Sequence, residues 1–141
     1  MNRAALTAPR GVPITVAAVK SYRDLILEVR TLIREVSVDA VKAALDEGRP
    51  AAIIDIREQD EIRRQGRIPG ALSIPRGILE SRIERDVPDR DREIIVYCAG
   101  GANSVLAARS LQEMGYRNVS SMSGGYYVWE AAKYPTEKPN A

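Results

Sequence analysis

The amino-acid sequence predicts an α/β protein with a central parallel sheet and helices on both faces of that sheet. Two apolar runs, residues 51–56 and 94–97, have the length of strands and are rich in Ile and Val. Continuous apolar runs of this kind are typical of strands buried on both faces of a parallel sheet. A segment that favours a helix follows each run, and strands that alternate with helices form covered parallel sheets.

Length and composition indicate one domain with a modest extension. The chain has 141 residues, of which 45% are hydrophobic and 28% charged, so it can bury a core of its own. Phenylalanine is absent, and aliphatic side chains must therefore build most of that core. The net charge is only +2, and the arginines are interleaved with Asp and Glu, as on an ordinary solvated surface. We therefore expect no nucleic-acid partner.

The presence of one cysteine and no histidine narrows the possible chemistry. A single cysteine excludes an intramolecular disulfide and a multi-cysteine zinc site. The lack of histidine excludes the usual metal-ligand clusters and the Ser-His-Asp and Cys-His modes of nucleophile activation. We expect no metal and no cofactor, and any thiol chemistry must be activated by backbone dipoles and nearby arginines.

The amino terminus contains an apolar stretch, residues 12–19, that Pro13 and Thr15 interrupt. It is too weak for a signal peptide and too short to span a membrane, so we expect a cytoplasmic location and no membrane partner. Residues 1–20 mix Pro, Gly, Thr and Ala without a sustained period. This pattern indicates a flexible or loosely docked extension.

Residues 21–35 predict an extra amphipathic helix that begins with the capping pair Ser21 and Asp24. Its apolar side chains recur at helical spacing and form one stripe: Leu25, Ile26, Val29, Leu32, Ile33 and Val36. Such a stripe needs a cover. We expect it to pack on its own domain, with a homodimer contact or a partner groove as the alternative.

Residues 36–133 form the predicted domain, and residues 134–141 form a tail with two prolines and little to bury. Helices are expected over residues 38–47, 58–65, 76–85, 103–114 and 126–132. Besides the two buried runs, short strands are expected over residues 34–38, 72–74 and 118–122.

The chain is organised around residues 93–114, where a buried strand, a tight loop and a helix follow one another. Cys98 ends the strand, four small residues follow it (Ala99, Gly100, Gly101 and Ala102), and helical spacing begins at Asn103. Such a loop leaves backbone N–H groups that can converge around one centre, while the helix adds its positive dipole end. A thiol held there is expected to favour its thiolate, the nucleophilic form. The alternative interpretation is a small, inert, buried cysteine.

Charged residues lie at the carboxyl end of the apolar run of residues 51–56. They are Asp55 and Arg57, with Glu58 immediately beyond. Ligands of open α/β sheets bind at that edge, so Asp55 and Arg57 are candidates for contact with a substrate. A structural ion pair between them, or with another arginine, is the alternative.

Three stretches of the chain, in their order and spacing, resemble the rhodanese family of sulfurtransferases. They are IDIREQDE at residues 54–61, GRIPGALSIP at 66–75, and VYCAGGANSVLAARSLQEMGYRNVSSMSGGYYVW at 96–129. The third is the most specific, because it joins a cysteine after a buried strand, a short loop, a helix, and a Gly-Gly turn followed by Trp129. The resemblance covers roughly residues 34–133 and implies a rhodanese-like domain with Cys98 at the base of the active loop.

The resemblance implies an enzyme of the thiosulfate sulfurtransferase type. In such proteins the cysteine takes a sulfane sulfur from a donor such as thiosulfate, holds it as a persulfide, and passes it to an acceptor such as cyanide or a thiol. Sulfite leaves readily without protonation, so the absence of a histidine base matters little. The N–H groups of Ala99 to Ser104 would hold the anion, and the acceptor must be external because the chain has no second cysteine.

The loop departs from the family pattern at two positions. Family loops often carry a cation just after the cysteine or at the sixth position, and here those positions are Ala99 and Asn103, which should weaken attraction for the thiosulfate dianion. A related phosphatase branch ends a longer loop with a phosphate-clamping arginine where this chain has Ser104, so phosphatase activity is not expected. The uncharged loop and the apolar stripe also support a second hypothesis, a non-catalytic rhodanese-like interaction or sulfur-carrier module.

Overall fold

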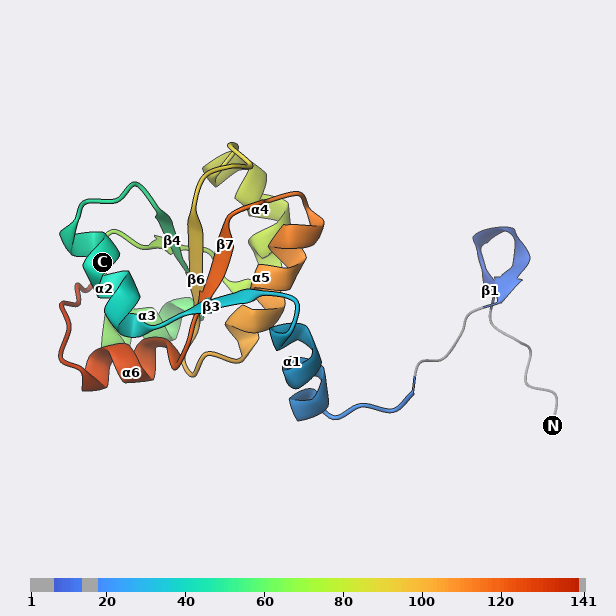
Figure 1. The fold of residues 1–141 in the computed structure, drawn as a ribbon, viewed down its shortest axis with the longest axis horizontal. Coiled ribbons are helices and arrows are strands. Elements are labelled where there is room, and N and C mark those ends of the chain that lie inside the picture. Colours follow the sequence, from blue (N-terminus) through green and yellow to red (C-terminus); the bar gives the residue numbers. More distant parts are fainter. Residues whose placement is uncertain (1–6, 14–17, 140–141) are drawn as a thin grey trace.

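The computed structural model describes residues 7–13 and 18–139 and confirms the predicted α/β class. Five parallel strands form one sheet in the order β3 (Arg34–Val36), β7 (Val119–Met122), β6 (Ile94–Tyr97), β4 (Ala52–Asp55) and β5 (Leu72–Ser73). The predicted apolar runs are β4 and β6, which lie side by side inside the sheet (Figure 1). Every residue of both strands is buried.

Helices cover both faces of this sheet, as predicted (Figure 1). Helices α4 (Leu79–Asp86) and α5 (Asn103–Glu113) pack on one face, and α2 (Val38–Asp46) and α6 (Gly125–Ala131) pack on the other. Helix α3 (Gln59–Gln65) follows β4, and a separate 3-10 turn, Arg76–Ile78, precedes α4 where one continuous helix was predicted. None of the described helices is both long and apolar enough to cross a membrane.

Strands β4 and β6 contribute to two cores because their successive side chains point to opposite faces. Ile54 and Val96 pack with α4 and α5, whereas Ile53 and Ile95 pack with α2 and α6. A strand packed from both sides has little freedom to shift. The residue that follows β6, Cys98, therefore has a well-defined position.

The amphipathic helix α1 (Tyr22–Arg30) is present but shorter than predicted. Ser21 and Asp24 form the predicted capping box. The prediction that the helix extends to residue 35 is wrong, because the helix ends at the C-cap Thr31 and residues 34–36 pair with β7 at the edge of the sheet. The overlapping prediction of a short strand over residues 34–38 is confirmed at residues 34–36.

The apolar stripe of α1 is only partly covered. Ile26 and Val29 are buried on the side where α1 lies against α5, and Ile33 packs partly against the core. Leu25 is 38% exposed and Leu32 is 50% exposed. A homodimer or partner contact through this stripe stays a prediction.

The amino-terminal extension contains a short hairpin that the sequence pattern did not predict. Strands β1 (Thr7–Ala8) and β2 (Val12–Pro13) pair in antiparallel register around a turn at Pro9–Gly11. The expected extension also includes residues 1–6 and 14–17, which lie outside the described residues. Its flexible or loosely docked character therefore stays a prediction.

The carboxyl-terminal tail contacts the domain more closely than its composition predicted. Glu137 pairs with Arg67 through two backbone hydrogen bonds of 2.8 and 2.9 Å, and the Glu137 carboxylate accepts a hydrogen bond from the Gly70 N–H at 3.0 Å. The Trp129 indole donates to the Pro135 carbonyl at 2.9 Å. Backbone pairing, which composition does not reveal, holds this segment.

Candidate active site

Cys98 follows β6 directly, at the carboxyl edge of the sheet. The loop of residues 99–102 comes next, and α5 begins at Asn103, as the sequence predicts. The Cys98 side chain is only 6% exposed and forms no disulfide. It nevertheless lines a surface pocket, so a small molecule can reach the sulfur.

Two backbone N–H groups of the loop converge on the sulfur of Cys98. The Gly101 nitrogen donates to Sγ at 3.2 Å, and the Ser104 nitrogen donates to it at 3.4 Å. The Ser104 hydroxyl lies 3.5 Å from Sγ and is held by the Ser121 hydroxyl at 2.7 Å. Donors in this arrangement stabilise negative charge on the sulfur.

The loop requires glycine because the Gly-Gly turn before α6 lies directly against it. Gly101 has a φ of +91°, and a Cβ at this position would lie 2.8 Å from the Gly124 nitrogen. Gly125 has a φ of +61°, and a Cβ there would lie 2.5 Å from the Ala99 carbonyl oxygen. Only glycine allows the two backbones to approach this closely.

The first turn of α6 also holds the loop by hydrogen bonds. The Tyr126 N–H donates to the Cys98 carbonyl at 2.9 Å, and the Tyr127 N–H donates to the Ala99 carbonyl at 3.0 Å. The Gly-Gly turn and the start of α6 are therefore the scaffold that aims the N–H groups of the loop at the sulfur.

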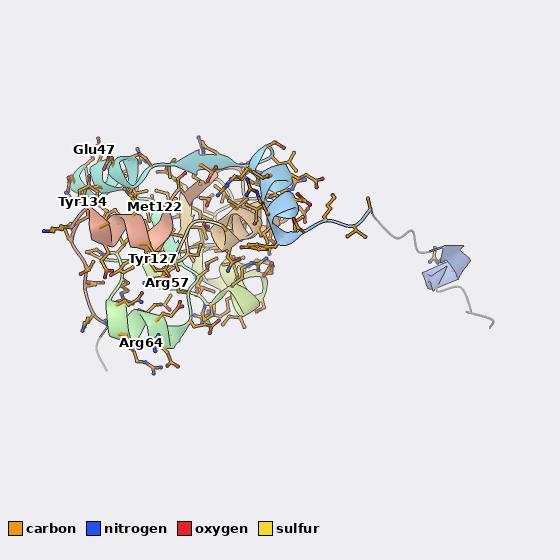
Figure 2. All side chains as sticks on the ribbon, turned by 90° about the horizontal axis from the view of Figure 1, so that it is seen from below. Glu47, Arg57, Arg64, Met122, Tyr127 and Tyr134 are labelled. Carbon is orange, nitrogen blue, oxygen red and sulfur yellow. The ribbon has the colours of Figure 1, made fainter. Side chains whose placement is uncertain are left out.

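Asp55 and Arg57 form a buried ion pair. The Nη2 and Nε groups of Arg57 donate to the two carboxylate oxygens of Asp55 at 2.8 and 3.0 Å, and neither side chain is more than 1% exposed. The guanidinium lies 3.9 Å from the centre of the Tyr126 ring and donates to the Gly66 carbonyl, which places it between α6 and α3 (Figure 2). Burial lowers the pKa of Arg57, but the hydrogen bond and charge of Asp55 outweigh burial and raise that pKa above its usual value. The geometry favours the structural alternative for this pair, although Arg57 also lines the pocket.

The pocket over Cys98 has a volume of about 210 Å³. Its walls follow the carboxyl ends of β4, β5 and β6 and comprise Ile56, Arg57, Glu58, Glu61, Arg76, Cys98, Ala99 and Asn103. Sequence reasoning missed Glu61 and Arg76, and it noted Glu58 only as a charge after β4. The sheet-edge rule that selected Asp55 could have found all three, had the order of the strands been known. Over residues 7–13 and 18–139, no group of three or more His, Cys, Asp or Glu side chains could hold a metal ion.

Arg76 is held at the pocket wall by Glu80. Its Nη1 group donates to both carboxylate oxygens of Glu80, at 2.9 and 2.8 Å, and the Ser110 hydroxyl donates to the same carboxylate at 2.6 Å. Burial raises the pKa of Glu80, but the hydrogen bonds from Ser110 and Arg76 outweigh burial and lower that pKa below its usual value. Glu80 is therefore ionised at neutral pH and keeps Arg76 in place.

Helix α1 reaches the active loop, a contact that the sequence did not predict. The Tyr22 hydroxyl donates to the Asn103 side-chain oxygen at 2.6 Å. Beside this contact lies a mostly apolar groove of about 300 Å³, lined by Tyr22, Arg23, Ile26, Leu27, Arg30 and Ala102. The extra helix therefore supports one side of the loop.

Comparisons with known proteins agree with this geometry. The family model for the Rhodanese-like domain matches residues 37–132. A sulfurtransferase of Allochromatium vinosum is 31% identical over 108 residues, which are 77% of this chain and 98% of that protein. The thiosulfate sulfurtransferase GlpE of Coxiella burnetii is 33% identical over 92 residues, which are 65% of this chain and 82% of that protein. A Rhodopseudomonas palustris protein of unknown function, described as a possible tyrosine phosphatase, has a solved structure that matches with a TM-score of 0.77 and 32% identity over 88% of this chain and 99% of its own.

Proposed function

Because the chain belongs to the rhodanese-like domain family of sulfurtransferases, we propose that it transfers a sulfane sulfur through a persulfide on Cys98. The observation that carries the proposal is the environment of Cys98. Its sulfur accepts hydrogen bonds from two backbone N–H groups, and the residue lines a pocket. A buried, inert cysteine needs neither feature. The proposed donor is a small sulfane compound such as thiosulfate, and the proposed acceptor is cyanide or an external thiol.

The first half-reaction loads the cysteine. The Cys98 thiolate attacks the outer sulfur of thiosulfate, a new S–S bond forms, the old S–S bond breaks, and sulfite leaves with its electron pair. No proton transfer is needed, which suits a chain without histidine. The N–H groups of Gly101 and Ser104 stabilise the charge first on the thiolate and then on the persulfide.

The second half-reaction discharges the persulfide. A thiolate or cyanide attacks the outer sulfur, the bond to Cys98 breaks, and the Cys98 thiolate returns. The chain has only one cysteine, so no internal disulfide can release the sulfur. An external acceptor is therefore part of the proposal, and so is a cytoplasmic location, where thiols stay reduced.

The test is intact mass spectrometry of the purified protein after brief incubation with thiosulfate, with and without a cyanide chase. A gain of one sulfur atom that cyanide removes is expected for the native protein. The Cys98→Ser variant should gain nothing. If neither thiosulfate nor a thiol persulfide adds sulfur to the native protein, the proposal fails.

Phosphatase chemistry is not part of the proposal, although one structural neighbour is described as a possible tyrosine phosphatase. A phosphate dianion needs a bidentate cationic partner at the end of the loop. The sixth position after Cys98 is Ser104, and the Arg57 guanidinium gives its donors to Asp55, Gln65 and Gly66. Arg76 follows β5 and is not at the end of the loop.

A non-catalytic interaction or sulfur-carrier module is the second candidate, and the partly covered apolar stripe of residues 25–36 favours it. Within this stripe, Leu25 is 38% exposed and Leu32 is 50% exposed. Under this alternative a homodimer or partner contact uses this stripe, and alkylation of Cys98 leaves the contact unchanged. Sedimentation of native and alkylated protein tests the homodimer, and turnover of sulfur donors at useful rates would contradict a purely non-catalytic role.

A further inference from the structure

The pocket over Cys98 carries a usable positive charge at Arg76. This side chain follows β5 and is 36% exposed. Only its Nη1 group is engaged by Glu80, and within the described part of the chain its Nε and Nη2 groups donate to no other protein atom. Arg76 can therefore offer two further N–H donors to an anionic group in the pocket.

The same pocket carries two negative charges at Glu58 and Glu61. They are three residues apart at the start of α3, on one side of the helix, and both line the pocket. Among the described residues, no basic group lies within 4.0 Å of either carboxylate. These carboxylates are therefore available to a cationic group.

The other positive charge in the pocket wall, on Arg57, is already neutralised by the buried carboxylate of Asp55. Arg57 gives its donors to Asp55, to the Gln65 side chain and to the Gly66 carbonyl. With Arg57 matched by Asp55 and Arg76 by Glu80, the two glutamates leave the site net negative. Such a site slows the entry of a small dianion such as thiosulfate, whereas a molecule that carries both signs of charge can meet Arg76 with its anionic group and the glutamates with its cationic group.

The volume of the pocket limits the size of that molecule. Pockets for drug-sized ligands have volumes of about 300–1,000 Å³. This pocket has about 210 Å³, which is below that range and suits a smaller molecule. A thiol of the size of an amino acid fits these dimensions.

We propose that the preferred sulfur acceptor is a small zwitterionic thiol, an amino-acid thiol whose carboxylate meets Arg76 and whose ammonium group meets Glu58 and Glu61. This inference rests on the proposed function and names its substrate class. The acceptor thiolate attacks the outer sulfur of the Cys98 persulfide, the bond between the two sulfurs of that persulfide breaks, and the products are the acceptor persulfide and the Cys98 thiolate. No oxidant or reductant is consumed.

The experiment measures the rate of discharge of the Cys98 persulfide, loaded with thiosulfate, by four thiols. L-Cysteine carries both charges, 3-mercaptopropionate only the carboxylate, cysteamine only the ammonium group, and 2-mercaptoethanol neither. Each thiol is compared between the native protein and a variant, so that the intrinsic reactivity of the thiol cancels.

Removal of a charge from the pocket should slow discharge only by the thiols that carry the opposite charge. Arg76→Gln should slow discharge by L-cysteine and 3-mercaptopropionate about fivefold, near the upper limit for a half-exposed ion pair, and should not slow cysteamine. The double variant Glu58→Gln/Glu61→Gln should slow L-cysteine and cysteamine about fivefold and should not slow 3-mercaptopropionate. Arg63→Gln and Asp60→Asn, which change an exposed pair on α3 outside the pocket wall, are the matched controls and should change no rate.

The outcomes separate this inference from the proposed function. If thiosulfate and a thiol persulfide both fail to load Cys98, the proposed function fails. If loading succeeds but both pocket variants change the four thiols by the same factor, or change none, the zwitterionic acceptor is overturned and the persulfide chemistry stands. Discharge by 2-mercaptoethanol, whose thiolate carries only the charge common to all four attacking thiols, reports damage to the fold and any general effect on thiolate attack, and the other three rates are expressed relative to it.

Discussion

Asp55 and Cys98 both lie at the carboxyl ends of neighbouring strands, one position apart in the register, and their surroundings differ. Asp55 ends β4, and its carboxylate is fully buried against Arg57 at 2.8 Å. Cys98 follows β6 and lines a pocket, and its sulfur accepts hydrogen bonds from two backbone N–H groups. The Asp55 carboxylate is paired within the protein, whereas the Cys98 sulfur stays accessible to an incoming molecule.

The difference teaches that the carboxyl edge of a sheet does not by itself make a charged residue functional. The Asp55–Arg57 pair joins the end of β4 to α3 and α6, because Arg57 also contacts Gln65 and the Tyr126 ring. These contacts favour a structural role for the pair in the frame of the site. The Cys98 loop is held by that frame, and the two regions should respond to substitution in different measurements.

The largest effect on chemistry is expected from Cys98→Ser. The substitution preserves the shape of the side chain and removes the sulfur, so sulfur loading should fall to zero while the free energy of unfolding changes by about 1 kcal/mol or less. Intact mass and urea unfolding measure the two quantities. A sulfur adduct on the variant would show that the site lies elsewhere.

The largest effect on stability is expected from Arg57→Met. Removal of Arg57 leaves the Asp55 carboxylate buried without its partner, which should cost about 3–5 kcal/mol in the free energy of unfolding. Arg63→Met, which breaks the exposed pair with Asp60, is the control and should cost about 0–1 kcal/mol. Urea unfolding measures both, and equal losses in the two variants would remove the distinction between the buried frame and the surface.

An intermediate effect that couples frame and loop is expected from Gly125→Ala. The new Cβ would lie 2.5 Å from the Ala99 carbonyl at a positive φ, so the loop must shift, at a cost of about 1–3 kcal/mol. A misplaced sulfur should also load about tenfold more slowly. Gly48→Ala has a similar φ of +68° with nothing within 4 Å, and it should cost stability without slowing the loading. If Gly125→Ala loads at the native rate, the Gly-Gly turn does not aim the loop.

The smallest effect is expected from Tyr22→Phe, which removes the hydrogen bond to Asn103. A single hydrogen bond contributes about 0.5–1.5 kcal/mol, and the exposed position places this one at the lower end. Sulfur loading should slow by about twofold if α1 supports the loop. Tyr134→Phe removes a hydrogen bond to Asp39 away from the loop and should leave loading unchanged. Equal loading rates in the two variants would show that α1 does not support the loop.

The sequence predicted the fold well wherever its patterns were local. The apolar runs at β4 and β6, the capping box of α1 and the start of α5 depend on residues a few positions apart, and the structure has all of them. The predicted helix over residues 21–35 overlapped the predicted strand over residues 34–38, and the structure has the strand at 34–36, where it pairs with β7. The contacts of the tail were missed because they join it to Arg67, Gly70 and Trp129, and composition does not show which segments of a chain meet.

The sequence by itself determined the strand, the small-residue loop and the helix around Cys98, because backbone hydrogen bonding, glycine freedom and helical spacing act over a few residues. Only the tertiary structure decided which charges surround the sulfur. The strand order β6-β4-β5 brings Glu58, Glu61 and Arg76 into one pocket with Cys98. Such convergence depends on the pairing of strands distant in sequence, and no pattern within a single segment contains that information.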